Sequence, residues 1–244
     1  MIASPGGTNE IPIVLTATII PNQVVAAESN PETRLAEYLE SLQFYRQFAP
    51  VIFLENSGYP LERHPEFAET ARLRVKKFAP SANPERGKGY QEFEMLDAWL
   101  AAEPEPPPRW LKISGRYQLH NIAAILGECR TESRGELIID QTARTGLSRT
   151  YSFCVNTDFY RQQLAGLYQQ CDDRTGEWIE RVLFRKLKTT AAGEVRLFVT
   201  QPRITAIAGS SGVAFPSGRG QWLCKQMLRN LNRLVDRKYL WYPK

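Results

Sequence analysis

Residues that could bind an anion or move a proton lie in the second half of three hydrophobic runs of the sequence or directly after them. The runs at residues 11–20, 51–54 and 110–113 are rich in β-branched or aromatic side chains, which predicts buried strands. In an open α/β sheet, ligands bind beyond the carboxyl ends of the strands, where these polar residues would meet. The residues are Thr16, Thr18, Pro21, Asn22, Glu55, Asn56, Ser57, Gly58, Lys112, Ser114, Gly115, Arg116 and Tyr117. The alternative is that they are ordinary polar loop residues.

A basic turn made of Arg86, Gly87, Lys88 and Gly89 precedes a predicted helix at residues 91–102. The glycines would let the backbone approach a ligand, the two cations supply donors, and the amides at a helix start favour an anion. This arrangement suits a diphosphate, although its spacing is neither that of a P-loop nor that of the dinucleotide-binding glycine motif. A solvated basic turn is the alternative.

Carboxylates that could act as a general base lie at the start of a predicted helix at residues 177–187. Glu177 and Glu180 are three residues apart and can share one helix face. A carboxylate there could deprotonate a hydroxyl, or it could simply stabilise the helix start. The sequence has neither a nucleophile-elbow motif nor a His, Cys and carboxylate cluster with metal-ligand spacing, so it predicts no metal ligands.

Strands and helices alternate along the chain, which predicts a three-layer α/β/α fold around a mostly parallel sheet. The further predicted strands lie at residues 135–140, 151–155 and 195–199. The further predicted helices lie at residues 31–48, 66–77, 121–126, 158–171 and 221–238.

The chain of 244 residues is 43% hydrophobic, which excludes a disordered or fibrous protein. We expect a flexible N-terminus at residues 1–10, one α/β domain at residues 11–218 and a basic C-terminal helix and tail at residues 219–244. The four cysteines are widely spaced, and no apolar run approaches the roughly 20 residues that a membrane span needs. A cytoplasmic location is therefore expected, with peripheral membrane contact left open.

The positive charge is concentrated at the C-terminus. Residues 219–244 hold seven of the 31 basic residues and one of the 26 acidic ones, so the rest of the chain sums to −1. This distribution argues against a nucleic-acid partner. The cations recur every four residues, at Lys225, Arg229, Arg233 and Arg237, opposite an apolar set. The helix could lie on an anionic membrane, or it could pack its apolar side on the sheet with its basic side in solvent.

The order of these motifs resembles that of bacterial glycosyltransferases with a GT-A-type nucleotide-sugar-binding domain, which act in surface-polysaccharide synthesis. The resemblance covers residues 11–185. The segments that carry it are residues 15–21, 53–59, 86–90, 111–117 and 176–180.

The resemblance implies a Rossmann-like transferase that moves a sugar from a nucleotide-sugar donor to the hydroxyl of a glycan or lipid-linked acceptor. The first strand end and residues 55–57 would then hold the nucleoside, Arg86 and Lys88 would lie near the diphosphate, and Glu177 or Glu180 would be the base.

In this family the third strand end usually carries Asp-x-Asp, which binds Mn²⁺ or Mg²⁺. Here the segment at residues 114–117 reads Ser-Gly-Arg-Tyr, which puts a metal in doubt. Arg116 could instead stabilise the leaving diphosphate. A sugar nucleotidyltransferase and a non-catalytic binding module of the same fold are the alternatives.

Overall fold

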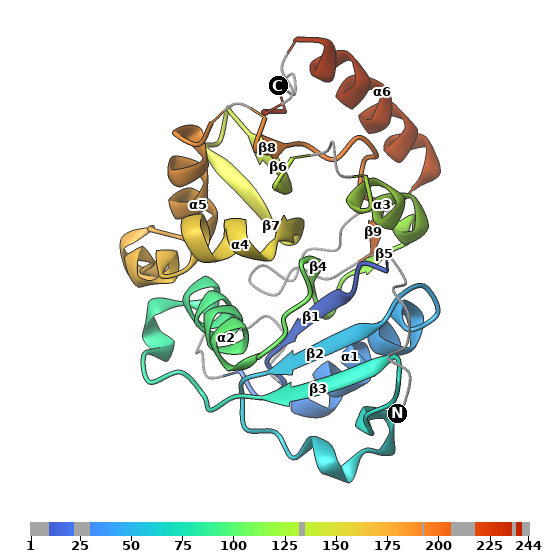
Figure 1. Cartoon of the computed structure of the whole chain (residues 1–244), viewed down its shortest axis with the longest axis vertical. Coiled ribbons are helices and arrows are strands. Elements are labelled where there is room, and N and C mark those ends of the chain that lie inside the picture. Colours follow the sequence, from blue (N-terminus) through green and yellow to red (C-terminus); the bar gives the residue numbers. More distant parts are fainter. Residues whose placement is uncertain are drawn as a thin grey trace, which may run out of the picture.

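A seven-stranded sheet forms the centre of the molecule (Figure 1), within a computed structural model that describes residues 10–21, 30–131, 135–191, 193–205, 218–235 and 238–240. The strand order is β3-β2-β1-β4-β7-β6-β8, and every neighbouring pair is parallel except the two that β7 makes. The strands are β1 (Ile13–Ala17), β2 (Val51–Glu55), β3 (Leu73–Lys77), β4 (Arg109–Ser114), β6 (Leu137–Thr142), β7 (Leu147–Asn156) and β8 (Val195–Arg196). A separate small sheet pairs β5 (Gln118–Leu119) with β9 (Ile204–Thr205).

Helices cover both faces of the main sheet (Figure 1). The α-helices of the described residues are α1 (Pro31–Tyr45), α2 (Lys88–Ala102), α3 (Ile122–Cys129), α4 (Thr157–Phe159), α5 (Ile179–Lys188) and α6 (Arg219–Val235). Successive residues of a strand point to opposite faces, so Ile13 and Leu15 pack with α1 and α3, whereas Val14 packs with α2 and α5. The predicted three-layer α/β/α fold with a mostly parallel sheet is confirmed.

The predicted helix at residues 66–77 is wrong. The chain instead makes a 3₁₀ turn at Pro65–Phe67 and then the strand β3, which pairs with β2 at the edge of the sheet. Leu73 is buried and Val75 packs against the core, while the residues between and after them are basic. This alternation has the period of a strand, and basic side chains are typical of an edge strand.

The predicted helix at residues 158–171 is broken into short turns. After α4 the chain forms a π-helical turn at Tyr160–Leu164 and a 3₁₀ turn at Leu167–Gln170. Asp97 of α2 holds this segment, because its carboxylate accepts hydrogen bonds from the Tyr160 hydroxyl at 2.8 Å and from the Gly166 amide at 2.7 Å. The segment is therefore shaped by a tertiary contact.

Helix α6 packs on the rest of the molecule through its polar side. This is the reverse of the alternative in which its apolar side packs on the sheet and its basic side faces solvent. Arg229, part of the predicted cationic stripe, is fully buried and pairs with Asp140 of β6. Lys225 is exposed, and Arg237 lies outside the described residues. Of the predicted N-terminal segment, only Glu10 is described. No helix in the described ranges is long and apolar enough to cross a bilayer.

Candidate active site

Glu55, the last residue of β2, ties the turn after β1 to the turn after β2. Its Oε1 atom accepts hydrogen bonds from the amides of Ile19 at 3.2 Å and of Ser57 at 2.8 Å, and from the Ser57 hydroxyl. The side chain is buried, which raises the pKa of the carboxyl. Its second oxygen has no hydrogen-bond partner in the described part of the chain. Glu55 and Ser57, both predicted site residues, thus form one cluster that fixes these turns.

Asn56 joins the same two turns to α2. Its Oδ1 atom accepts a hydrogen bond from the Thr18 hydroxyl at 2.6 Å, and its Nδ2 atom donates to the main-chain oxygen of Gln91 at 3.2 Å. Pro21 ends the described part of the turn after β1, and the predicted site residue Asn22 lies outside it. The carboxyl ends of β1 and β2 therefore meet at Asn56, as the sequence predicts.

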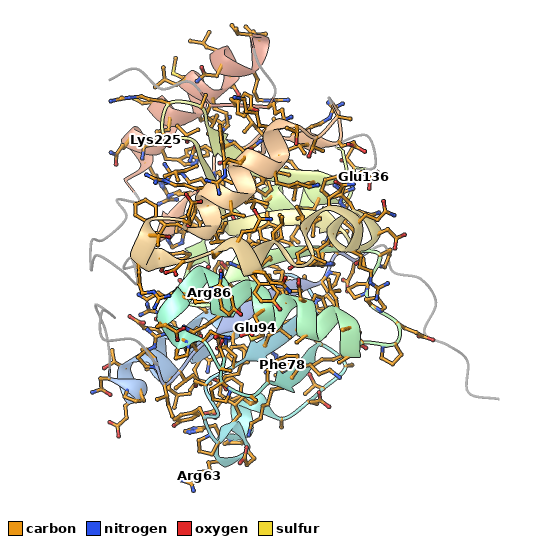
Figure 2. The ribbon with its side chains drawn as sticks, turned by 90° about the vertical axis from the view of Figure 1, so that its left-hand side faces the viewer. Arg63, Phe78, Arg86, Glu94, Glu136 and Lys225 are labelled. Atoms are coloured by element: carbon orange, nitrogen blue, oxygen red, sulfur yellow. The ribbon has the colours of Figure 1, made fainter. Side chains whose placement is uncertain are left out.

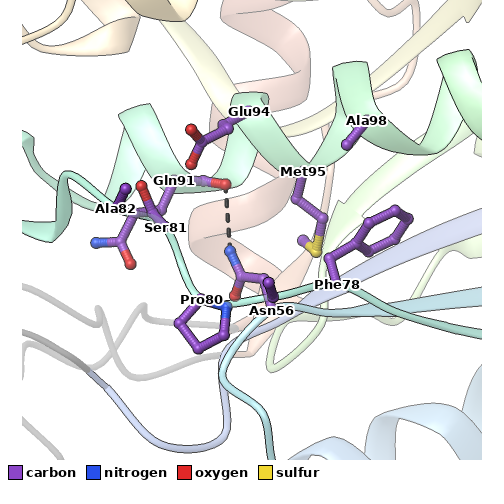
Figure 3. Close-up of a pocket in the computed structure, with 10 residues that line it drawn as sticks. Asn56, Phe78, Pro80, Ser81, Ala82, Gln91, Glu94, Met95 and Ala98 are labelled. Carbon is purple, nitrogen blue, oxygen red and sulfur yellow. Dashed lines mark hydrogen bonds between the residues drawn. The ribbon is translucent and has the colours of Figure 1, made fainter.

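A pocket of about 270 Å³ opens beside Asn56, between α2 and the segment that follows β3 (Figure 3). Flat or flexible apolar side chains form part of its wall, and amide, hydroxyl and carboxylate groups form the rest. Its lining residues are Asn56, Phe78, Ala79, Pro80, Ser81, Ala82, Gln91, Glu94, Met95 and Ala98. A planar group with a polar edge suits such a lining.

Glu92 of α2, which the sequence analysis does not single out, reaches the carboxyl ends of β1 and β4. Its Oε1 atom accepts hydrogen bonds from the Thr16 hydroxyl at 2.5 Å and the Ser114 hydroxyl at 3.4 Å, and it pairs with Lys112 at 2.6 Å. Lys112 is fully buried and also donates to the Ser114 hydroxyl and to the Thr150 carbonyl. All three ammonium hydrogens thus have an acceptor, so Lys112 binds α2, β4 and β7 together.

Three cations lie close enough beside this network for their charges to interact. Burial, together with the positive charges of Arg34 and Arg116, lowers the pKa of Lys88 to about 8. Arg116 pairs with Glu37 at 2.6 Å, and Arg34 donates from Nε to the Thr18 carbonyl at 2.9 Å. The sequence predicts roles for Lys88 and Arg116 but misses Arg34, which comes from α1. An anion placed among them would be stabilised, because it would relieve their mutual repulsion.

The glycines of the basic turn lie against protein side chains. Gly87 has φ = +115°, and a Cβ there would lie 2.1 Å from the Asp173 carboxylate, while a Cβ at Gly89 would lie 2.3 Å from Cγ2 of Ile179. Asp173 also accepts a hydrogen bond from the backbone amide of Lys88, at the start of α2. The absence of side chains at these two positions therefore lets the segment before α5 pack on α2, a different reason from the predicted approach of a ligand.

Arg86 fixes the same neighbouring segment. Its guanidinium donates to the carbonyl of Cys171 at 2.9 Å and to that of Gln169 at 2.5 Å, and it lies over the ring of Tyr90 at 4.6 Å from the centroid. Figure 2 shows Arg86 near the middle of the face that is turned to the viewer.

The two candidate bases lie in different environments. Glu180 is half-buried in the first turn of α5, and its Oε1 atom accepts a hydrogen bond from the Thr150 hydroxyl at 3.1 Å. Burial raises the pKa of Glu180, and the charge of Glu92 adds to this effect. Glu177 forms an ion pair with Arg185 near the surface, which lowers its pKa. Glu180 therefore has the environment of a base, and Glu177 has that of a surface ion pair.

Tyr117 lies between the acidic and the basic groups. Burial raises the pKa of its phenol, the negative charges of Glu92 and Glu180 raise it further, and the positive charge of Arg116 lowers it. Its main-chain oxygen accepts a hydrogen bond from the buried Tyr45 hydroxyl at 2.7 Å, which holds the segment after β4 in place. The predicted site residues of the first and third strand ends thus surround one region.

The donor atoms at the end of β4 do not fit Mn²⁺ or Mg²⁺, which prefer several carboxylate oxygens. Arg116 is a cation, and the nearby carboxylate of Glu92 is paired with Lys112. Across the described ranges, no group of three or more His, Cys, Asp and Glu side chains could hold a metal ion.

No protein-family model matches the chain, and no curated protein sequence matches it. Solved structures with a related arrangement include a mannosyltransferase from Pyrobaculum calidifontis in complex with GDP-Man and Mn²⁺, at 8% identity and a TM-score of 0.47, which covers 94% of this chain and 65% of the other. A 4-diphosphocytidyl-2C-methyl-D-erythritol synthase from Anaerococcus prevotii is 6% identical, with a TM-score of 0.45 and coverage of 92% and 97%. Mouse xyloside xylosyltransferase 1 is 11% identical, with a TM-score of 0.42 and coverage of 77% and 84%. At such TM-scores these similarities do not identify an activity.

Proposed function

We propose that the protein is a glycosyltransferase that moves a sugar from a nucleotide-sugar donor to the hydroxyl of a glycan or lipid-linked acceptor. The observation that carries this proposal is that Arg116 interacts with the charge of Lys88 on one side and with Tyr117 on the other, and that Tyr117 in turn interacts with the half-buried carboxylate of Glu180. The reaction needs these two functions side by side, because a diphosphate leaves with negative charge while a hydroxyl loses its proton.

The donor diphosphate would lie against Arg34, Lys88 and Arg116. Its negative charge would restore the protonated form of Lys88, whose pKa of about 8 reflects burial and the two neighbouring cations. The nucleoside would lie beyond the ends of β1 and β2, with its base in the pocket next to Asn56. The residues that would shape this donor site are Thr16, Thr18, Pro21, Glu55, Ser57, Gly87, Lys112, Ser114 and Tyr117, with Arg86 holding the segment before α5.

In the proposed reaction the acceptor oxygen attacks the anomeric carbon of the sugar. A carbon–oxygen bond forms there, and the bond between that carbon and the diphosphate oxygen breaks. The proton of the acceptor hydroxyl passes to the carboxylate of Glu180, and the electron pair of the broken bond leaves with the nucleoside diphosphate. Lys88 and Arg116 stabilise the charge that develops on this leaving group.

Glu180 suits the role of base better than Glu177. A raised pKa makes the carboxylate a stronger base, and proton transfer is most efficient when the pKa of the base lies near the working pH. The pKa of Glu177 is lowered by its ion pair with Arg185, so its carboxylate would be a weaker base.

The test is calorimetric titration of the full chain with UDP, GDP, ADP and CDP, with and without Mn²⁺. We expect one nucleoside diphosphate to bind, and we expect Lys88→Gln and Arg116→Gln each to weaken it about tenfold or more, since each removes a charge-assisted contact. Arg63→Gln is the matched control, because Arg63 is an exposed cation at one end of the molecule, away from Arg86 of the basic turn that holds Lys88 (Figure 2). Failure of all four nucleotides to bind would overturn the proposal.

A second measurement identifies the reaction. The protein is incubated with the nucleotide-sugar that matches the bound nucleotide, and release of the diphosphate is followed. A parallel incubation with the nucleoside triphosphate and a sugar 1-phosphate tests for nucleotidyl transfer. Diphosphate release supports the proposal, whereas pyrophosphate release in the second incubation alone would replace it with a sugar nucleotidyltransferase.

A further inference from the structure

Helix α6 presents its polar side to the protein. Arg229 pairs with both carboxylate oxygens of Asp140, at 2.7 and 2.6 Å, and neither side chain is more than 4% exposed. One turn before Arg229, Gln226 donates to the carbonyl of Val199, and two turns before it Trp222 donates from its indole nitrogen to the carbonyl of Gln201. These contacts fix the orientation of the helix about its own axis.

The opposite side of α6 is apolar and faces solvent. The exposed fractions are 54% for Leu223, 68% for Met227, 62% for Leu231, 84% for Leu234 and 88% for Val235. Spacings of three and four residues place Leu223, Met227, Leu231 and Leu234 on one stripe along the helix. The only other large hydrophobic side chains exposed in the described residues, Ile20 and Trp178, lie far from α6 in the sequence. This concentration differs from scattered surface hydrophobics and marks an interaction surface.

The charge of α6 indicates which partner fits this stripe. The helix contains four cations and no acid, and of these Arg219 and Lys225 are exposed. Arg219 lies in the first turn nearer the flank of the stripe, whereas Lys225 lies on the opposite side of the helix, so the two add to the positive charge of the helix as a whole. Anionic lipid headgroups would attract them while acyl chains cover the stripe.

The position and length of the helix fit a surface that is flat. Figure 1 shows α6 as the outermost element at one end of the molecule, where Arg229 ties it to Asp140 of β6. Its 17 residues make a helix about 25 Å long, too short and too charged to cross a bilayer. It can therefore lie parallel to a bilayer surface but cannot span it.

We propose that α6 docks the protein on anionic lipid bilayers, with Leu223, Met227, Leu231 and Leu234 inserted among the acyl chains and the positive charge of Arg219 and Lys225 attracting the helix to the headgroups. The buried Arg229–Asp140 pair holds the apolar stripe outward, so the surface is present before any lipid binds. This inference does not depend on the proposed transferase activity.

The test is co-sedimentation of the full chain with phosphatidylcholine vesicles that contain or lack phosphatidylglycerol. We expect binding to the anionic vesicles, and we expect the triple variant Met227→Gln, Leu231→Gln, Leu234→Gln to lower the partition coefficient more than about tenfold. Lys225→Gln should lower it about fivefold. Arg63→Gln, the matched control for loss of one exposed cation, should leave it unchanged.

Two outcomes would overturn the proposal: equal pelleting of the wild-type chain and the triple variant, or no preference for anionic over neutral vesicles. A third would replace it with a dimer interface, namely a dimer by light scattering that the triple variant converts to a monomer, with no vesicle binding by either. The single variant Leu234→Gln guards against misfolding, since this side chain is 84% exposed, and it should weaken vesicle binding at an unchanged melting temperature.

Discussion

The carboxylate of Glu180 accepts a hydrogen bond from the hydroxyl of Thr150 at 3.1 Å, across the contact between α5 and β7. Three residues earlier, Glu177 turns to the surface and pairs with Arg185. The two acids were equivalent candidates in the sequence, and the fold gives them opposite pKa shifts, upward for Glu180 and downward for Glu177. Glu180 therefore fits the role of proton acceptor in the proposed reaction better than Glu177 does.

Replacing Glu180 should separate catalysis from binding. We expect Glu180→Gln to lower kcat by about a hundredfold or more, the usual effect of removing a general base, while the nucleoside diphosphate still binds with its original Kd. Glu177→Gln is the matched control and should change kcat less than about twofold, because Glu177 contributes only to a surface ion pair. Diphosphate release and calorimetry measure the two effects. A loss of activity in Glu177→Gln, with full activity in Glu180→Gln, would assign the base to the other acid.

Burial raises the pKa of Glu180, and the hydrogen bond from Thr150 opposes that rise. The raised pKa predicts that kcat/KM falls on the acid side at a pH above the ordinary glutamate value of 4.5, because the base must be unprotonated. The Thr150 hydroxyl stabilises the carboxylate, so its removal in Thr150→Val should raise the pKa and move the acid limb to higher pH. The pH profile of kcat/KM tests both statements. An acid limb that stays in place in Thr150→Val would show that another group controls it.

Binding of the nucleoside diphosphate should depend on the protonation of Lys88. In the protein without bound nucleotide the pKa of Lys88 is about 8, and a bound anion would raise it, so affinity is highest below that pH. As the pH rises above it, the free protein loses the charge and the Kd should increase. Calorimetry between about pH 7 and 9.5 measures this change.

Two variants show whether Lys88 is the titrating group. Lys88→Arg keeps its charge over the whole range, so its Kd should stay flat where that of the wild type rises. Lys88→Gln should bind weakly at every pH. A rise of the wild-type Kd that persists in Lys88→Arg would mean that a different group titrates.

The sequence predicted the parts of the fold that depend on local pattern. The hydrophobic runs of β1, β2 and β4 gave strands in the right places, and the polar residues after them meet as expected. Glu92 and Arg34 were missed because each lies inside a helix with no neighbouring motif, and only the packing of α1 and α2 on the sheet brings them to its carboxyl edge. The packing of α6 was also missed. Arg229 meets its partner only in the folded chain, because that partner is 89 residues away in the sequence.

The close approach of Asp173 to Gly87 should make the free energy of unfolding sensitive to a side chain at residue 87. Gly87→Ala places a Cβ at φ = +115° and within 2.1 Å of the Asp173 carboxylate, so we expect it to lower the free energy of unfolding by about 2 kcal/mol or more. Asp173→Ala should also destabilise, because the Lys88 amide loses its acceptor. The double variant should lose less than the two single losses together, since it removes the clash. Urea unfolding measures all three, and strict additivity would contradict the geometry.

The Arg229–Asp140 pair should be the contact that holds α6 on the sheet. Arg229→Leu leaves the Asp140 carboxylate buried without its partner, and loss of one member of such a pair costs about 3–5 kcal/mol. The double variant Arg229→Leu, Asp140→Leu should be more stable than Arg229→Leu alone, because it leaves no unpaired charge. Lys225→Gln, an exposed change one turn away, should alter the free energy of unfolding by less than about 0.5 kcal/mol. Urea unfolding measures the three variants. If Arg229→Leu were as stable as Lys225→Gln, α6 would be held by contacts other than this ion pair.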